Sequence, residues 1–164
     1  MCRLALRAKR RIGVPKMAPV TIVAELSSNP APRWDILPFL DAAMVAGADA
    51  VKVQLFKPNH FPLAERIEKL AATFPRLLFG DFVAGAHDRG MLAGASVFDY
   101  EAVVMCKRAA DFIKLAAREE HNVPLRLLAW LTGLPVYRSA DWRKLRRKPM
   151  RLPREVTMAC IPQY

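Results

Sequence analysis

The sequence predicts an α/β fold in which strands and helices alternate along the chain and the strands form a parallel sheet. Short runs rich in β-branched and small apolar residues alternate with segments of helical spacing. Glycines stand where several helices should end, directly before the next strand. Strict alternation of this kind favours a parallel sheet with right-handed crossovers. The predicted strands are residues 21–26, 50–55, 91–96, 112–116, 134–138 and 155–161.

The strand at residues 50–55, AVKVQL, organises the rest of the prediction. Side chains alternate between the two faces of a strand, so Lys52 and Gln54 point away from the apolar face. A parallel strand flanked by helices is normally buried on both faces. Burying a lysine and a glutamine is costly unless they bind something. The strand therefore indicates a site for an anionic ligand.

The segments between the strands have recognisable helix signals. Pro38 fits the first turn of a helix over residues 33–46, because proline is tolerated there. Asp99 is a suitable N-cap for a helix that runs to about Ala110. Further helices are predicted at residues 63–73, at 76–89 before Gly90, and from Pro124 to near Gly133. In the basic segment 140–154, prolines leave room for at most one short helix.

Length and composition indicate one domain with a substantial core. The chain has 164 residues, and its 53% hydrophobic content excludes a disordered protein. The sequence contains no run of about 18 apolar residues, so no membrane span is predicted. Cys2, Cys106 and Cys160 show no CxxC spacing, and the last two lie among apolar residues. Buried thiols in a reducing cytoplasm are the simplest interpretation, so a cytoplasmic location is expected.

The net charge of +11 is concentrated in two segments. Residues 1–16 and 140–154 each contribute a net charge of +6, so the rest of the chain is nearly neutral. Solvated basic segments explain this better than nucleic-acid contact, which is the alternative. Residues 1–16 are expected to be a flexible extension. Alternatively, the start of the protein has been assigned too far upstream, and these residues are not part of it. The domain would then comprise residues 17–164, starting at Met17.

Polar residues recur at the carboxyl ends of the predicted strands. A (β/α) barrel places its active site there. No GxGxxG motif follows the first strand, which disfavours an open dinucleotide-binding sheet. The predicted fold is therefore a parallel TIM-barrel type, incomplete, with about six of eight strands. The polar residues are Glu25, Lys52, Gln54, Ser96, Lys114, Glu119 and Ser139.

The order of the strand motifs resembles the barrel domain of the sialic acid synthases, also called N-acetylneuraminate synthases. Residues 46–57, AGADAVKVQLFK, match the family's second strand at nearly every position. Each of the remaining strand motifs is a less specific match by itself, but together they follow the family's order over residues 20–164. They are Ala24-Glu25, ASVFD at 95–99, IKLAARE with NVPL at 113–125, PVYRSA at 135–140 and ACIPQY at 159–164.

The resemblance implies condensation of phosphoenolpyruvate with N-acetylmannosamine or a related sugar, which forms a nonulosonic (sialic) acid. It implies that Lys52 and Lys114 hold the phosphate and carboxylate of phosphoenolpyruvate. Gln54, Ser96 and Ser139 would orient the same anion. Two carboxylates, Glu25 and Glu119, are the implied catalytic groups for the sugar hydroxyls or the attacking water, and Tyr164 would lie on the sugar side.

The sequence also departs from the family pattern. Ala117 and Arg118 stand where the family has serine and glycine, and Arg118 is expected to place a bulky cation beside the site. The resemblance implies a divalent metal, Mn²⁺ or Mg²⁺, but the family's histidine ligands have no counterpart here, so no metal ligand is assigned. His60 and His87 are expected to be surface residues. His121, beside two glutamates, is a weak alternative ligand.

These departures leave the activity open. The chain is interpreted as a synthase-like transferase, degraded or split, with little synthase activity by itself. The alternative is a non-catalytic anion-binding or fragment protein that pairs with another chain. The first and last strands are expected to be open edges, so a homodimer or a complementing chain is the expected partner.

Overall fold

A computed structural model describes residues 21–26, 35–119, 121–141 and 155–160. Three features predicted from the sequence lie outside these ranges. They are the extension 1–16 with its boundary at Met17, most of the basic segment 140–154, and Tyr164. Within the described residues, no helix is both long enough and apolar enough to cross a membrane.

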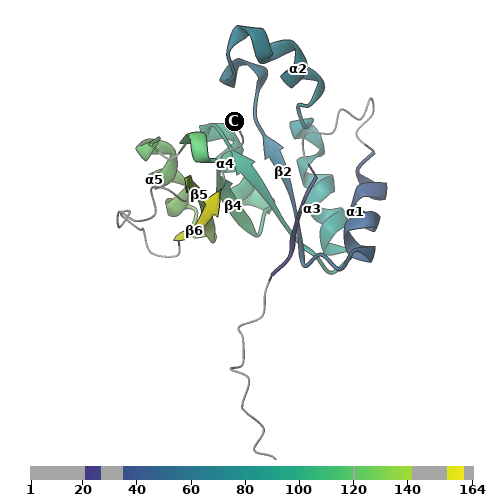
Figure 1. Cartoon of the computed structure of the whole chain (residues 1–164). Coiled ribbons are helices and arrows are strands. Elements are labelled where there is room, and N and C mark those ends of the chain that lie inside the picture. Colours follow the sequence, from purple (N-terminus) through teal and green to yellow (C-terminus); the bar gives the residue numbers. More distant parts are fainter. Residues whose placement is uncertain (1–20, 27–34, 120, 142–154, 161–164) are drawn as a thin grey trace, which may run out of the picture.

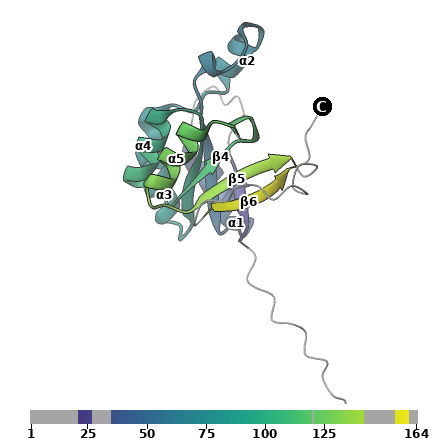
Figure 2. The same ribbon diagram turned by 90° about the vertical axis from the view of Figure 1, so that its left-hand side faces the viewer.

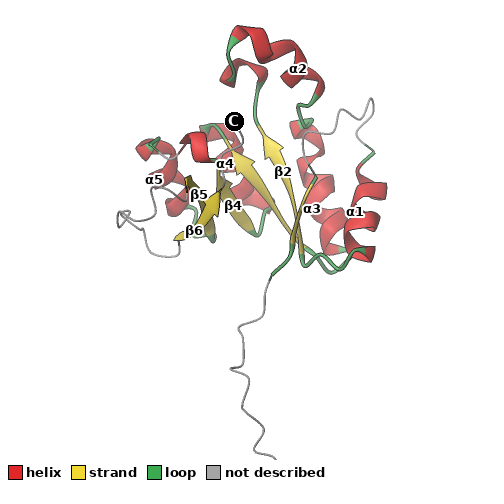
Figure 3. Ribbon diagram, viewed as in Figure 1, coloured by secondary structure: helices red, strands yellow, loops and turns green. Residues whose placement is uncertain are grey.

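The described strands form one parallel sheet in which every strand pairs with its neighbour in sequence (Figures 1 and 3). The prediction of a parallel α/β fold is confirmed, and the curled sheet is consistent with part of a (β/α) barrel. The strands are β1 (Val23–Glu25), β2 (Ala50–Leu55), β3 (Leu92–Val97), β4 (Phe112–Leu115), β5 (Val136–Asp141) and β6 (Glu155–Cys160).

Side-chain caps start three of the five α-helices. Asp35, Asp99 and Asn122 each accept a backbone N–H in the first turn of the helix that follows. Pro38 lies in the first turn of α1, as predicted. The helices are α1 (Ile36–Val45), α2 (Arg66–Ala71), α3 (Phe79–His87), α4 (Tyr100–Ala109) and α5 (Val123–Leu131).

The largest difference from the predicted elements concerns the segment after β2. The helix predicted at residues 63–73 is only the short α2, preceded by a 3-10 helix at Leu63–Glu65. Its apolar residues are exposed, Ile67 by 85% and Leu70 by 66%, so their helical spacing does not reflect a buried face. Residues 56–74, called the arm below, carry α2 beyond the carboxyl ends of the strands (Figure 1).

The hydrophobic core lies between the sheet and its helices. Figure 2 shows α3, α4 and α5 together on one side of the strands. The strand residues that face them include Val51, Val53 and Leu55, all buried as predicted. Cys106 is also buried there, and burial raises the pKa of its thiol to about 12. The opposite side of the sheet, which carries Lys52 and Lys114, is called the inner face below.

Gly94 leaves room for an aromatic side chain to lie against the inner face. It pairs in register with Phe112 of the neighbouring strand. A Cβ atom built on Gly94 would stand only 2.4 Å from the Phe112 ring. Because Gly94 has no side chain, the Phe112 ring can cover this part of β3.

Gly94→Ala is expected to destabilise the protein by about 1–3 kcal/mol, because the Phe112 ring must shift or the strands must separate. Urea unfolding measures the change. Gly80→Ala in α3 is the matched control, because its Cβ would meet nothing within 4 Å. That change should be neutral or stabilising by up to about 1 kcal/mol. Equal stability of the two variants would contradict this account of Gly94.

Candidate functional site

Lys52 is the centre of the candidate site. It is the third residue of β2, and only 4% of its surface is exposed. Its Nζ donates a hydrogen bond to Ser96 Oγ at 2.8 Å and forms an ion pair with Glu25. The register places Glu25 directly across from Lys52 on β1. The structure thus brings Glu25, Lys52 and Ser96 together on the inner face.

Burial changes the protonation of Lys52. Desolvation lowers the pKa of this lysine from 10.5 to about 8, and the positive charge of Lys114 acts in the same direction. The carboxylate of Glu25 opposes the shift by favouring the ammonium form. Near neutral pH, Lys52 is therefore mainly a cation, with a larger fraction of neutral amine than an ordinary lysine.

A cavity of about 290 Å³ adjoins Lys52 on the inner face. The rings of Phe112 and Tyr137 pack edge to face at 5.4 Å within its lining. We call it the lysine cavity. It is lined by Thr21, Val23, Glu25, Ala50, Lys52, Leu92, Phe112, Lys114 and Tyr137.

The position of the lysine cavity differs from the expected one. Ala50, Leu92 and Phe112 are the first residues of their strands, so the cavity extends toward the amino ends of the sheet. The sequence suggested a site at the carboxyl ends. Glu25, Lys52 and Lys114 lie farther along their strands and provide the charged part of the lining.

Three other implied ligand residues lie outside the cavity lining. Gln54 and Ser96 are register partners on neighbouring strands, and Ser96 pairs in turn with Lys114. Gln54, Ser96 and Lys114 thus form a row across three neighbouring strands, closer to the carboxyl ends of the sheet. Ser139 is buried on β5, and its Oγ has no hydrogen-bond partner among the described residues.

Glu119 lies apart from the cavity lining. It ends a 3-10 helix, Ala117–Glu119, that follows β4. Its Oε2 accepts a hydrogen bond from Asn122 Nδ2 at 2.9 Å, next to the start of α5. This contact gives Glu119 a structural role at the helix cap, whereas Glu25 directly contacts Lys52.

Sequence reasoning missed an ionic cluster at the carboxyl ends of β2 and β3. Arg76 binds Asp99 through both terminal nitrogens, at 2.6 and 3.2 Å, and donates to the carbonyl oxygen of Leu55 at 2.8 Å. It also contacts Glu101 at 3.0 Å, which in turn binds Lys57 at 2.6 Å. A single arginine inside a predicted helix gave no signal of this arrangement.

His60 belongs to the same cluster, so its interpretation as a surface residue is wrong. Its side chain is 20% exposed, and its Nε2 lies 3.3 Å from Asp99 Oδ2. Its Nδ1 accepts the backbone N–H of Lys57 at 3.1 Å, which fixes the Nε2–H tautomer. Burial lowers the pKa of His60, although Asp99 opposes this. Both ring nitrogens are therefore engaged, and His60 acts as a structural link.

Arg118, a departure from the family pattern, binds the arm. Its Nη2 donates to the carbonyl oxygen of His60 at 2.8 Å, and its guanidinium lies 4.7 Å from the centre of the Phe61 ring. The residue does not line the lysine cavity. The bulky cation thus ties the segment after β4 to the arm.

The described residues do not fit a metal ion of the kind that the resemblance implies. They contain no group of three or more histidine, cysteine, aspartate or glutamate side chains placed to hold one. His121 makes no such group with Glu119, and Glu120 between them is not described.

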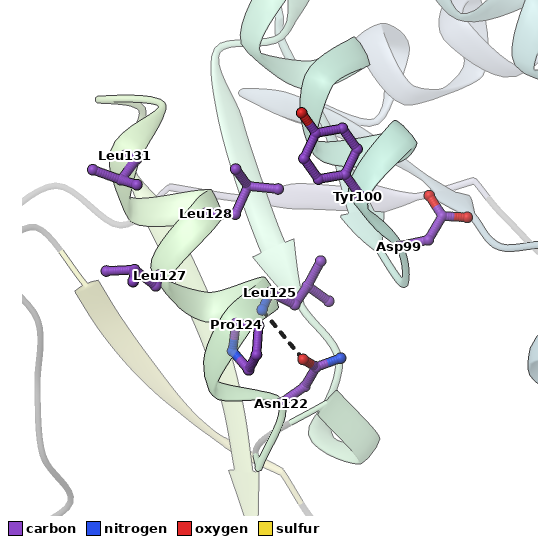
Figure 4. Close-up of a pocket in the computed structure, with 8 residues that line it drawn as sticks. All are labelled: Asp99, Tyr100, Asn122, Pro124, Leu125, Leu127, Leu128 and Leu131. Carbon is purple, nitrogen blue, oxygen red and sulfur yellow. Dashed lines mark hydrogen bonds between the residues drawn. The ribbon is translucent and has the colours of Figure 1, made fainter.

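A second cavity, of about 470 Å³, lies between α4 and α5 on the helical side (Figure 4). Leucines of α5 and Tyr100 of α4 supply most of its lining. Two of its polar side chains already have partners: Asn122 Oδ1 accepts from the Leu125 N–H at 3.2 Å, and Asp99 binds Arg76. This cavity therefore lacks the charged groups that would orient an anion.

The fold of this chain is similar to that of several solved synthases and biosynthesis proteins. The N-acetylneuraminic acid (sialic acid) synthetase of Leptospira borgpetersenii, solved with citrate, matches with a TM-score of 0.75 and 22% identity over 90% of this chain. The spore coat polysaccharide biosynthesis protein SpsE of Bacillus subtilis matches with a TM-score of 0.70 and 23% identity over 91% of this chain. The predicted resemblance is confirmed at the level of the fold.

A more distant match is a truncated 3-deoxy-D-arabino-heptulosonate 7-phosphate synthase of Thermotoga maritima, with a TM-score of 0.56 and 17% identity over 73% of this chain. This chain covers 56%, 46% and 39% of the three solved chains, respectively. No family model matches the sequence, and no curated protein matches it.

Proposed function

We propose that the inner face binds phosphoenolpyruvate and that the protein belongs to the sialic acid synthases, acting on an amino sugar such as N-acetylmannosamine. The observation that supports this most directly is that two lysines, Lys52 and Lys114, line the same cavity. Two cations suit a ligand with a phosphate and a carboxylate group. Ser96, bonded to Lys52, adds a hydroxyl to the same side.

In this proposal each residue has a defined task. Lys52 and Lys114 neutralise the two anionic groups, and Gln54, Ser96 and Ser139 supply hydrogen bonds toward the carboxyl ends of the strands. Glu25 holds Lys52 in the absence of ligand and is the candidate for proton transfer. Glu119 and Tyr164 remain proposals for the sugar side, and a divalent metal would need ligands from outside the described residues.

The test of binding is titration calorimetry of the full chain with phosphoenolpyruvate, followed by an assay with N-acetylmannosamine and Mn²⁺. Binding that is abolished by removal of either cavity lysine supports the proposal. Unchanged binding in both lysine variants would overturn it. Little turnover is expected of this chain alone, because no group of side chains among the described residues is placed to hold the metal that would polarise the aldehyde.

Phosphoenolpyruvate affinity is expected to fall as the pH rises above about 8. Free Lys52 loses its proton near that pH, and only the ammonium form attracts the anion. The bound anion favours the ammonium and so raises the pKa of Lys52 in the complex. Between the two pKa values, affinity should fall by up to about tenfold per pH unit. Calorimetry from pH 7 to 9 measures this, and a flat profile would contradict the role of Lys52.

A non-catalytic protein that pairs with another chain is the second candidate. Among the described strands, β1 and β6 are the outer members of the sheet. On the β1 side, Ile22 is 55% exposed. Exposed edges of this kind pair readily with other strands. A homodimer in sedimentation, together with absent phosphoenolpyruvate binding, would favour this function over the first.

A further inference from the structure

Lys52 has the surroundings of a reactive amine as well as those of an anion-binding cation. It is buried, it borders a cavity, and it touches one carboxylate and one hydroxyl. Simple charge neutralisation does not require burial, because an exposed lysine can also hold a phosphate. Covalent chemistry with a carbonyl compound does benefit from burial, since desolvation favours the neutral, nucleophilic form.

We infer that Lys52 forms a reversible imine with a small 2-oxo carboxylic acid bound in the lysine cavity, with Lys114 holding the carboxylate of that ligand. The mainly apolar part of the lining, with Phe112 and Tyr137, accommodates the remainder of a short carbon chain. The cavity volume of about 290 Å³ suits a small ligand.

The described groups account for every proton in this step. The neutral Nζ of Lys52 attacks the carbonyl carbon, and the carbonyl oxygen becomes the hydroxyl of a carbinolamine. Glu25, which contacts Nζ directly, carries two protons from the nitrogen to the oxygen in turn. The first completes the carbinolamine hydroxyl, and the second goes to that hydroxyl as it departs. The products are the imine and one water molecule, and neither an oxidant nor a reductant is consumed.

The lowered pKa of Lys52 agrees with this chemistry and has the same physical origin, the burial of the amine beside the cavity. An ordinary lysine, with a pKa of about 10.4, has only about one neutral amine per thousand at pH 7.4. The pKa of about 8 for Lys52 makes the neutral fraction greater by more than a hundredfold. Solvent-exposed lysines should therefore react far more slowly at neutral pH.

The inference shares its cavity with the proposed function but does not rest on it. A 2-oxo acid has the carboxylate of phosphoenolpyruvate without the phosphate. The two ligands also respond to pH in opposite ways, because anion binding needs the ammonium and imine formation needs the amine. Calorimetry with phosphoenolpyruvate and trapping with a 2-oxo acid can thus succeed or fail separately.

The test is reductive trapping of the full chain with pyruvate and sodium borohydride at pH 7.5, followed by peptide mass mapping. Hydride adds to the imine carbon and leaves a stable carboxyethyl group on the lysine. We expect labelling of Lys52 to exceed that of Lys107, an exposed lysine of α4, by more than about tenfold. Labelling should rise between pH 6 and 8.

Two variants make the result decisive. Lys52→Arg keeps a cation but cannot form an imine, so selective labelling should disappear while the protein remains folded by circular dichroism. Lys114→Gln should reduce labelling of Lys52 about tenfold or more by removing the partner of the carboxylate. Equal labelling of Lys52 and Lys107, or no label on Lys52, would overturn the inference. Neither result would contradict the separate proposal that the cavity binds phosphoenolpyruvate.

Discussion

Lys52→Met is expected to weaken phosphoenolpyruvate binding at least about a hundredfold. Loss of a buried, hydrogen-bonded cation that contacts an anion costs about 2–5 kcal/mol, and about 3 kcal/mol corresponds to this factor. The variant also leaves the carboxylate of Glu25 at the site without the ammonium that it contacts. That negative charge should then repel the ligand. Titration calorimetry at pH 7 measures the affinity.

Two further variants separate loss of a specific contact from loss of charge. Lys107→Met removes one positive charge from the exposed side of α4 and should leave the affinity unchanged. Glu25→Gln in the Lys52→Met background should recover part of the lost affinity by removing the repulsion. Equal losses in the Lys52 and Lys107 variants would indicate that only net charge attracts the ligand.

Arg76→Met is expected to destabilise the protein by about 2–4 kcal/mol, which is a large part of the stability of a domain this size. Arg76 is 14% exposed and binds Asp99, Glu101 and the carbonyl oxygen of Leu55. Methionine fills similar space but leaves a half-buried carboxylate and a carbonyl group without this donor. Urea unfolding at pH 7 measures the loss.

The pH dependence provides a second readout for Arg76. Burial alone would raise the pKa of Asp99, but hydrogen bonds from Arg76 and the Ala102 N–H hold it below its usual value. A lowered carboxyl pKa stabilises the folded state above the unfolded pKa, about 3.9, and this contribution is lost as the pH falls through the folded pKa. The difference between wild type and Arg76→Met should therefore shrink toward pH 3.

Arg89→Met is the matched control for Arg76. Its guanidinium binds Asp41 at 2.7 Å, but the Asp41 side chain is 55% exposed. Water can solvate that carboxylate after the change, so a loss of about 1 kcal/mol or less is expected. An Arg76 variant no less stable than the Arg89 variant would show that the cluster around Asp99 does not stabilise the fold.

The sequence allowed prediction of the fold because each element has a local signal. The strand at 50–55 has the same bounds in the structure, and the Asp99 cap begins α4 as expected. The positions of Lys52 and Lys114 followed from alternation along their strands. These features depend on the spacing of apolar residues, on capping side chains and on turn residues, all of which can be read from neighbouring positions in the sequence.

Contacts between distant segments could not be predicted in the same way. The bond of Arg118 to the carbonyl oxygen of His60 joins residues 58 positions apart. The overlap of Phe112 with Gly94 depends on the register of two strands, which no local pattern specifies. The arm misled the prediction because its apolar spacing looks helical, whereas burial, which normally accompanies that spacing, is absent.

The strand order has a consequence for how the protein is made. No strand in the described sheet pairs across a skipped neighbour, so each new strand finds its partner in the segment synthesised just before it. The sheet can therefore assemble stepwise from β1 to β6 as the chain leaves the ribosome, without waiting for a distant segment. At each step the newest strand presents an unpaired edge for only as long as translation of the next unit takes. Slow codons between two strands would prolong that exposure, and translation speed should therefore influence the soluble yield of this protein.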